Sequence, residues 1–429
     1  MDCIVPPLAD AFRNENGYAL AAILSPIPPP NDPSRITAIA SLSTPSTITN
    51  DLRASLRQIL PSPDELTAWT DIFTYYHRSL VSILTVSSST SPSWTPTYHL
   101  WRDLLSSLHR AYTHGHLSVW TLPLLYQTTS YLRTLALRAD ATLPASHSPD
   151  PSLSSPNLED CARQINRVFA LVTQDRTPMP NRKYGTYRVA VLLFKTYFRL
   201  NSISLCKNIV RSINASAGDM PPLEFFPRAH RVSYAYYVGV VAFLEERYEA
   251  AESELEGAYA LCLAGEGGAR QAERILTYLV PVKLLVRHVL PSKALLARHG
   301  RLEGLFGGLV RAVKRGNLKG FDEALADGEE EFVRMRVYLT LERGRDVCAR
   351  NLLRRVYLNA GWEGEVRRSR IPVAEWRAGL KVVGEEVEGD EVEALIAGLI
   401  YKNLIKGYIS RAHSMVVLNK KGAFPGTGV

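Results

Sequence analysis

The residues of this chain that could do chemistry are cations concentrated near its C-terminal end. A Lys or Arg side chain that lies near a phosphate releases condensed counterions, so several together give salt-sensitive binding that reads no base sequence. The pattern therefore predicts contact with a nucleic-acid backbone. The candidate nucleic-acid-binding residues are Arg350, Arg354, Arg355, Arg367, Arg368, Arg370, Lys402, Lys406, Arg411, Lys420 and Lys421, with Arg182 and Lys183 as a second patch.

The same cations are compatible with two other roles. Cations are favoured near the C-terminal ends of helices in any protein, so part of this charge could be ordinary surface charge. The net charge of +8 also favours an acidic protein partner, and a disordered acidic chain would be held by the same side chains. The residues alone leave surface charge, nucleic acid and an acidic partner open.

The sequence carries no motif of a catalytic or cofactor-binding centre. It has no Gly-Lys-Ser/Thr phosphate loop, no nucleophile elbow and no metalloprotease His-Glu pair. The Gly265–Gly268 cluster has no strand before it, which favours an inter-helix turn over a nucleotide site. His114 and His116 have no Cys or carboxylate cluster beside them, which favours a helix-ending turn over a metal site. We therefore expect a protein that is not an enzyme and that uses no cofactor and no metal.

Composition and cysteine spacing favour an intracellular protein. The five cysteines show no metal-ligand or redox spacing, as is typical of reduced thiols. The first residues lack the basic and apolar regions of a secretory signal. Ile275–Leu290 is the longest apolar stretch, but Pro281, Lys283 and Arg287 interrupt it. We expect a buried helix pair or a kinked helix there rather than a membrane span.

The last part of the chain has the pattern of a winged helix, three helices followed by a two-stranded ribbon. Helices are predicted over 346–358, over Pro372–Val383 and from Asp390 onward, because their apolar residues recur with helical spacing. Tyr408–Arg411 and Met415–Leu418 are rich in strand-forming residues and follow a glycine. A plain helical C-terminus with an irregular tail is the alternative, and it leaves these two β-rich segments unexplained.

The third predicted helix constrains how nucleic acid could be bound. A winged helix that reads DNA presents the N-terminal residues of this helix to the major groove. Here those residues are Asp390, Glu391 and Glu393, which phosphates would repel. The sequence therefore disfavours base-specific DNA reading. It favours backbone contact by the wing and by the loop that carries Arg367, Arg368 and Arg370, which suits RNA or single strands.

The rest of the chain reads as helices joined by turns. Leu8–Leu24 is expected as one helix, and the Pro/Ser-rich stretch 143–157 as a linker. Small and bulky residues alternate in Tyr248–Tyr259 as in tetratricopeptide-like hairpins. The predicted fold is mainly α, a tetratricopeptide-like helical-repeat arm that ends in a winged helix. The predicted domains are an irregular N-terminal helical region (1–157), the arm (158–344), the winged helix (345–421) and a tail (422–429).

This combination resembles the PCI-domain family, over about residues 158–426. The similarity is greatest to the subgroup that contains COP-nine signalosome subunit twelve and the PCI subunit of the TREX-two mRNA-export complex. The stretches that carry it are Asn181–Gly185, Leu193–Phe198, Leu205–Lys207, Tyr236–Gly239, Ala242–Leu244, Tyr278–Lys283, Leu399–Tyr401 and Ile405–Ser410.

The resemblance implies a function that composition does not show. Such proteins are non-catalytic subunits of nuclear complexes in mRNA transcription, processing or export. They pair with a second PCI-domain protein and bind a small acidic protein of the Sem/DSS type. We accordingly expect a nuclear protein, also present in the cytoplasm, that binds RNA, or DNA without sequence specificity. The alternative implied by the shared fold is a pure protein scaffold of a signalosome-like or proteasome-lid-like complex, without direct nucleic-acid binding.

Overall fold

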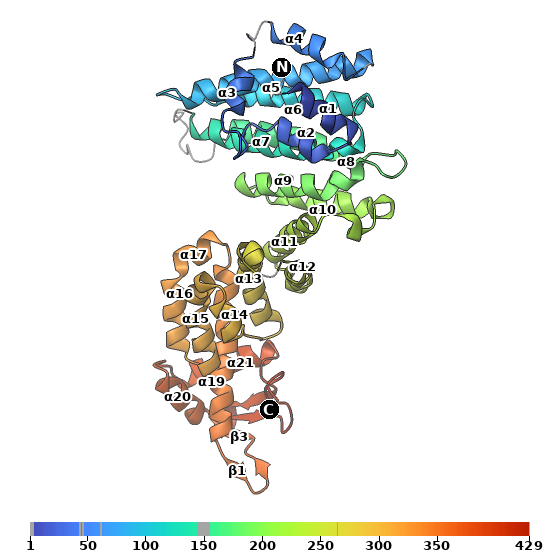
Figure 1. Cartoon of the computed structure of the whole chain (residues 1–429). Helices are drawn as coiled ribbons and strands as arrows, with labels where there is room; N and C mark the ends of the chain where they lie inside the picture. The colour runs from blue at the N-terminus through green and yellow to red at the C-terminus, as the bar shows by residue number, and fades with distance from the viewer. Residues whose placement is uncertain are drawn as a thin grey trace. The chain divides into compact units, whose positions relative to one another are not determined.

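The computed structural model describes residues 4–42, 44, 47–60, 62–143, 155–263 and 265–428. The described chain is mainly helical, and its strands lie between residues 362 and 418 (Figure 1). It divides into two compact units, Met1–Tyr237 and Val238–Val429, and the division falls within helix α11 (Arg228–Leu244). Most of the stretch predicted as a linker lies outside the described residues. The predicted domain limits at 157, 344 and 421 stay predictions.

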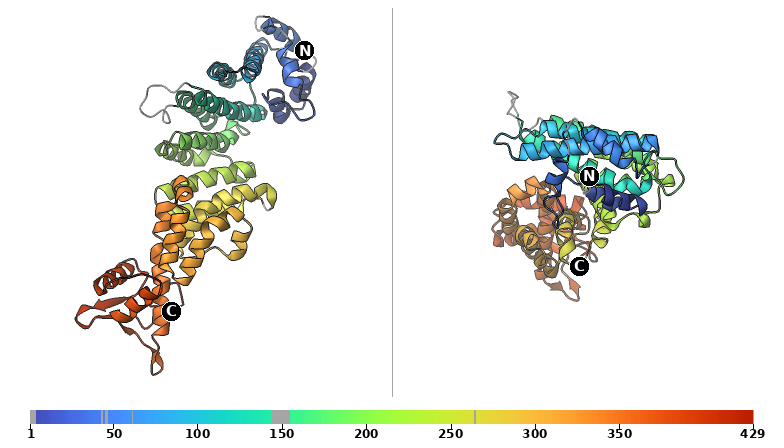
Figure 2. Two further views of the ribbon diagram at one scale, coloured as in Figure 1. Left: turned by 90° about the vertical axis from the view of Figure 1, so that its left-hand side faces the viewer. Right: turned by 45° about the horizontal axis from the view of Figure 1, so that its top comes forward.

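The first unit is a stack of helices in which each long helix packs against the next one along the chain. The neighbours from α4 to α9 lie side by side in this way (Figure 2). The α-helices of this unit before α11 are α1 (Val5–Arg13), α2 (Gly17–Ile23), α3 (Arg35–Ala40), α4 (Ile48–Leu56), α5 (Pro63–Ser87), α6 (Thr95–Thr113), α7 (Leu122–Ala141), α8 (Pro156–Thr173), α9 (Thr186–Arg199) and α10 (Ser204–Ala215).

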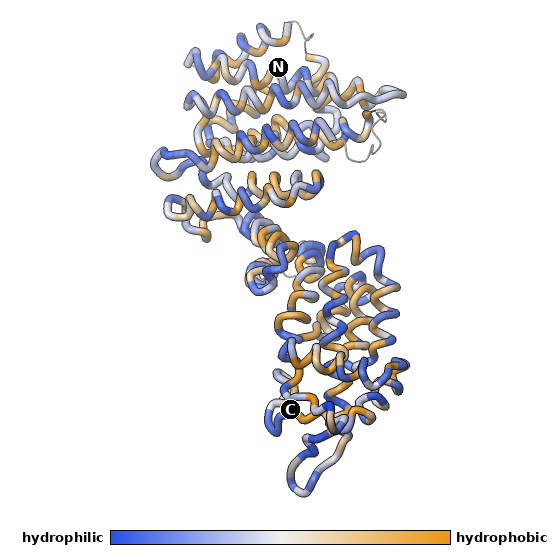
Figure 3. The backbone as a smooth tube through the Cα atoms, turned by 180° about the vertical axis from the view of Figure 1, so that it is seen from behind, coloured by the Kyte–Doolittle hydropathy of each residue, from blue (hydrophilic) through white to orange (hydrophobic). Residues whose placement is uncertain are grey.

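Proline placement and aromatic burial explain the long helices of this unit. Helices α5, α6, α7 and α8 each have a proline in the first turn, where the missing N–H would have no partner within the helix. Trp69, Tyr76 and Trp101 are at most 1 % exposed. The indole N–H of Trp101 donates to the backbone oxygen of Thr128 over 2.9 Å. Hydrophobic residues recur along each helix (Figure 3), as expected when one face is buried.

The single helix predicted over Leu8–Leu24 is wrong. The structure contains two helices there, α1 and α2, because the chain turns at Glu15, whose φ is +47°. Asn16 then caps α2, since its side-chain oxygen accepts a hydrogen bond from the backbone N–H of Ala19. The apolar spacing continues through this turn, so a prediction from periodicity alone treats the two helices as one.

The second unit begins with helical hairpins. Pro281 lies within α13, so the apolar stretch that contains it is helical up to Val286. Helices α11 and α12 approach closely at Gly239, where a Cβ atom would lie 2.7 Å from Cγ of Leu255. The helices that follow α11 are α12 (Tyr248–Ala260), α13 (Glu266–Val286), α14 (Lys293–Ala297), α15 (Gly300–Arg315), α16 (Leu318–Asp327), α17 (Glu329–Arg334) and α18 (Tyr338–Glu342).

The second unit ends in a winged helix. Three strands form an antiparallel sheet in the order β3-β5-β4, and α20 packs between α19 and α21. Trp376, Leu380 and Ile396 lie in its core, each 1 % exposed. The predicted fold, a helical-repeat arm with a terminal winged helix, is confirmed. The elements are α19 (Arg345–Asn359), β3 (Arg370–Pro372), α20 (Val373–Val382), α21 (Gly389–Tyr401), β4 (Gly407–Ser410) and β5 (Met415–Leu418).

The strands differ from the predicted ribbon in two respects. The sheet has a third strand, β3, in the segment predicted as a loop, so Arg370 lies on a strand. A separate hairpin, β1 (Trp362–Glu363) and β2 (Val366–Arg367), projects beyond the sheet (Figures 1 and 2). Both strand pairs involve only two or three residues per strand, which is too few for alternation to show in the sequence.

Candidate nucleic-acid interface

The sheet of the winged helix has one buried face and one that turns outward. Ile371 and Val416 pair across β3 and β5, and both are fully buried against the helices. The neighbouring row on the other face consists of Arg370, Val417 and Tyr408, because each pair lies directly opposite in the register. Arg370 and Tyr408 are exposed, Tyr408 by 63 %. We call the face that carries this row the outer face.

Lys406 extends the outer face by one row. Its backbone oxygen accepts from the N–H of Asn419 over 2.9 Å, which continues the β4–β5 pairing by one residue. Side chains alternate along an extended segment, so Lys406 projects on the same side as Tyr408. Lys420 and Lys421 follow β5 and are exposed. Within the described part of the chain, the side chains of Arg370, Lys406, Lys420 and Lys421 have no ion pair and no hydrogen bond.

Three of the predicted cations are held in ion pairs inside the winged helix. Lys402 Nζ lies 2.6 Å from Oδ2 of Asp346, on α19. Arg411 Nε lies 3.0 Å from Oε2 of Glu393, on α21. Arg368 NH1 lies 2.9 Å from Oε1 of Glu375, on α20. Each pair ties a residue that directly follows a strand or helix to a different helix, so less of each charge is left for a phosphate.

Two of the three arginines of α19, Arg350 and Arg354, are turned toward the fold. Arg350 is 4 % exposed and donates to the side-chain oxygen of Asn351, and burial together with the neighbouring Arg354 lowers its pKa. Arg354 and Arg355 each donate to a backbone oxygen at 3.4 Å, that of Thr427 and that of Lys314. Of the three, only Arg355 is exposed. The contacts that these arginines make are therefore mainly within the fold.

Arg367 anchors the β1–β2 hairpin. Its guanidinium lies 4.5 Å from the ring centre of Trp362 and 5.6 Å from that of Tyr357. It also donates to the backbone oxygen of Leu358 over 2.9 Å. Trp362 is 63 % exposed, so this stack holds an aromatic ring at the surface.

The pair predicted as a second patch lies in the other compact unit and is turned inward. The guanidinium of Arg182 holds both carboxylate oxygens of Asp175, at 2.9 and 3.1 Å, and donates to the backbone oxygen of Tyr112. Lys183 is 7 % exposed and donates to the backbone oxygen of Asp219. Both side chains thus make hydrogen bonds within the fold, so the structure gives no support to a phosphate-binding role for Arg182 and Lys183.

The N-terminus of α21 presents carboxylates, as the sequence suggested. Glu388 and Glu391 form a reciprocal capping box with the first turn of the helix. Glu393 is bound by Arg411. The end of the helix that would enter a DNA groove is therefore already neutralised by its own acidic side chains.

Comparison with known proteins shows to which family this chain is related. The sequence pattern of the PCI domain matches residues 325–420, from the end of α16 through β5. The "Protein CSN12 homolog" of Gibberella zeae is 43 % identical over the whole of both chains, and that of Neurospora crassa is 42 % identical over the whole of both. The "PCI domain-containing protein 2 homolog" of Drosophila melanogaster is 34 % identical over 71 % of this chain and 73 % of its own. The chain belongs to the family of CSN12 homologues with a C-terminal PCI domain.

In this CSN12-type chain the PCI match contains every predicted cation after residue 349 except Lys421, and it excludes Arg182 and Lys183. Sequence reasoning missed Tyr408 as a candidate contact residue. The spacing in the sequence could have indicated it. Tyr408 stands two positions after Lys406, at the start of a predicted strand, and side chains two positions apart on a strand lie on the same face.

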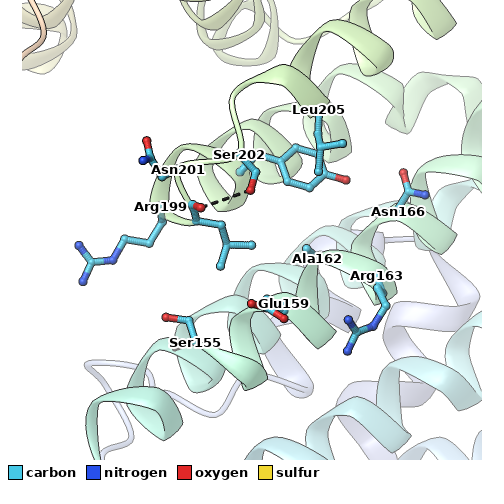
Figure 4. A pocket seen from close by; sticks show the side chains of 11 residues that line it. Ser155, Glu159, Ala162, Arg163, Asn166, Arg199, Asn201, Ser202 and Leu205 are labelled. Atoms are coloured by element: carbon cyan, nitrogen blue, oxygen red, sulfur yellow. Dashed lines mark hydrogen bonds between the residues drawn. The ribbon is translucent and has the colours of Figure 1, made fainter. Parts of the chain in front are cut away.

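The first unit of this CSN12-type chain has a groove outside the winged helix. Figure 4 shows a groove of about 360 Å³ between α8 and the α9–α10 turn, with Glu159, Ala162 and Arg163 on one side and Arg199, Asn201 and Ser202 on the other. Across the described ranges, no group of three or more His, Cys, Asp or Glu side chains is placed to hold a metal. No described helix is both long and apolar enough to cross a membrane.

Proposed function

We propose that this chain is a non-catalytic PCI scaffold subunit of a nuclear complex in mRNA transcription, processing or export, and that its winged helix binds RNA. In this proposal it pairs with a second PCI-domain protein and also holds a small acidic protein of the Sem/DSS type. It is nuclear, with a share in the cytoplasm. The family similarity and the observed fold support the scaffold role.

One observation carries the RNA-binding part of the proposal. Arg370, Lys406, Lys420 and Lys421 are exposed, lie on or beside one small sheet, and have no carboxylate partner among the described residues. A cation without a carboxylate partner can neutralise a phosphate and release its counterions. Lys402 and Arg411 would first have to break their ion pairs with Asp346 and Glu393. This narrows the predicted set of thirteen cations to four.

The mode of binding is backbone contact. The acidic N-terminus of α21 disfavours insertion into a DNA groove, because Glu388, Asp390 and Glu391 would face phosphates. Contact through the sheet and its flanking lysines needs no groove. The proposal therefore has RNA as its ligand, bound without base-specific reading.

The test is charge reversal of the four free cations. Replacing Arg370, Lys406, Lys420 and Lys421 by Glu is expected to weaken RNA binding at low salt by at least tenfold. The slope of log affinity against log salt should fall by about 0.7 for each phosphate that the variant no longer neutralises, as for other single-strand binders. Fluorescence anisotropy with a short labelled RNA measures both quantities.

A matched control carries the same change in charge elsewhere. Arg53, Arg57, Arg211 and Arg274 are exposed and lie outside the winged helix. Their reversal to Glu should leave the salt slope close to that of the unmodified chain. Equal loss of affinity in both variants would mean that net charge alone attracts RNA. Unchanged affinity in the first variant would favour the pure protein scaffold.

A further inference from the structure

The outer face of the sheet combines an aromatic ring with cations. Tyr408 is 63 % exposed and lies opposite Val417, with Arg370 at the far side of the same row. Lys406 stands in the next row. The remaining positions of this face by register are Asn419, Pro372, Met415 and Ser410, so none of the three rows contains a carboxylate.

An exposed tyrosine on such a face needs a physical explanation. The strand fixes the backbone of this tyrosine, and its side chain has only two rotatable χ angles, so ordering the ring on binding costs little entropy. Base–aromatic stacking is independent of base identity, and flanking cations follow the phosphates of the same strand. A duplex hides its base faces, whereas an unpaired strand offers them. An acidic peptide would use the cations but would gain less from an open ring.

We propose that the outer face is a platform for single-stranded RNA, on which Tyr408 stacks with one unpaired base while Arg370 and Lys406 contact the adjacent phosphates. This inference rests on the proposed RNA-binding function and adds the stacking residue and the strandedness of the ligand. A second exposed tyrosine of the winged helix serves as a control for Tyr408. Tyr401, at the end of α21, is 91 % exposed but lies off the sheet.

The experiment compares tyrosine variants of the full chain, with oligouridylate and a blunt RNA duplex of equal length as probes. Tyr408→Thr removes the ring but keeps a residue that favours strands. It is expected to weaken oligouridylate binding about fivefold to a hundredfold, the range seen when one stacking partner is removed. Its salt slope should stay unchanged, because no cation has been removed. Tyr408→Phe should bind much more tightly than Tyr408→Thr, since it keeps the ring.

The control and the other outcomes separate this inference from the proposed function. Tyr401→Ala should leave oligouridylate binding unchanged. If Tyr408→Thr binds as the unmodified chain does while reversal of the four cations abolishes binding, RNA binding stands and the stacking platform is wrong. Duplex affinity equal to oligouridylate affinity would also overturn it. So would loss of pairing with a second PCI protein in Tyr408→Thr without loss of RNA affinity.

Discussion

At the scale of single residues, the ion pair of Arg182 and Asp175 in the first unit is largely buried. The side chain of Asp175 is 2 % exposed and is held by two nitrogens of Arg182 and by the backbone N–H of Arg182. The hydrogen bonds from the Arg182 guanidinium, more than any other contact, hold the pKa of the Asp175 carboxyl well below its usual range. Arg182 is thus tied to the stability of the unit.

We predict that Asp175→Ala lowers the free energy of unfolding by about 3 kcal/mol, because it leaves the half-buried guanidinium without its partner. In the unmodified chain the contribution of this carboxyl is present above its usual pKa near 4 and disappears as the pH falls toward its depressed value. Chemical denaturation at neutral and acid pH measures both. The exposed pair of Asp10 and Arg13 supplies the control, since Asp10→Ala should change stability by less than about 1 kcal/mol.

Residue types could be predicted from the sequence, but their partners could not. Lys402 and Lys406 look alike in the sequence, yet Lys402 meets Asp346 on another helix and Lys406 meets no described carboxylate. The difference depends on the direction in which each side chain projects from α21 or from the sheet. It also depends on contacts between residues more than fifty positions apart. The pattern of charges along the sequence does not show which distant residues pair in the fold.

At the scale of elements, the long helices and the four-residue strands β4 and β5 were predictable, and the shorter strands β1, β2 and β3 were not. Helices α19, α20 and α21 each span at least ten residues, so their apolar spacing repeats several times. Strand β3 spans three residues and depends on β5 for its hydrogen bonds. Its existence is decided by tertiary contact, which explains why Arg370 was expected in a loop.

The hairpin of α11 and α12 gives a prediction about close packing. A methyl group at Gly239 would lie 2.7 Å from Cγ of Leu255, which is fully buried, so Gly239→Ala should lower the free energy of unfolding by about 1–3 kcal/mol. Gly257 on α12 has no atom within 4 Å of the same position. Gly257→Ala should therefore raise stability by about 0.5–1 kcal/mol through helix propensity alone. Thermal or urea unfolding of both variants decides; a loss of stability at both positions would contradict the packing argument.

At the scale of the whole molecule, the proposal requires the surfaces for RNA and for an acidic protein to be distinct. If the outer face serves RNA, a preformed complex with a Sem/DSS-type acidic protein should bind oligouridylate within about threefold of the lone chain, and with the same salt slope. Anisotropy titrations of the lone chain and of the complex measure this. A marked drop in RNA affinity on assembly would place the acidic protein on the same cations. As a control, the variant with four reversed cations should still bind the acidic protein.

The central position of β5 makes the outer face a late product of synthesis. Arg370 and Tyr408 are translated before Met415–Leu418, and their strands β3 and β4 hydrogen-bond to that segment and not to each other. A polypeptide that stops short of Met415 would keep the residues of α19, α20 and α21 but would have no sheet on which to display Arg370 and Tyr408. If this face binds RNA as proposed, only chains translated through β5 would be able to do so.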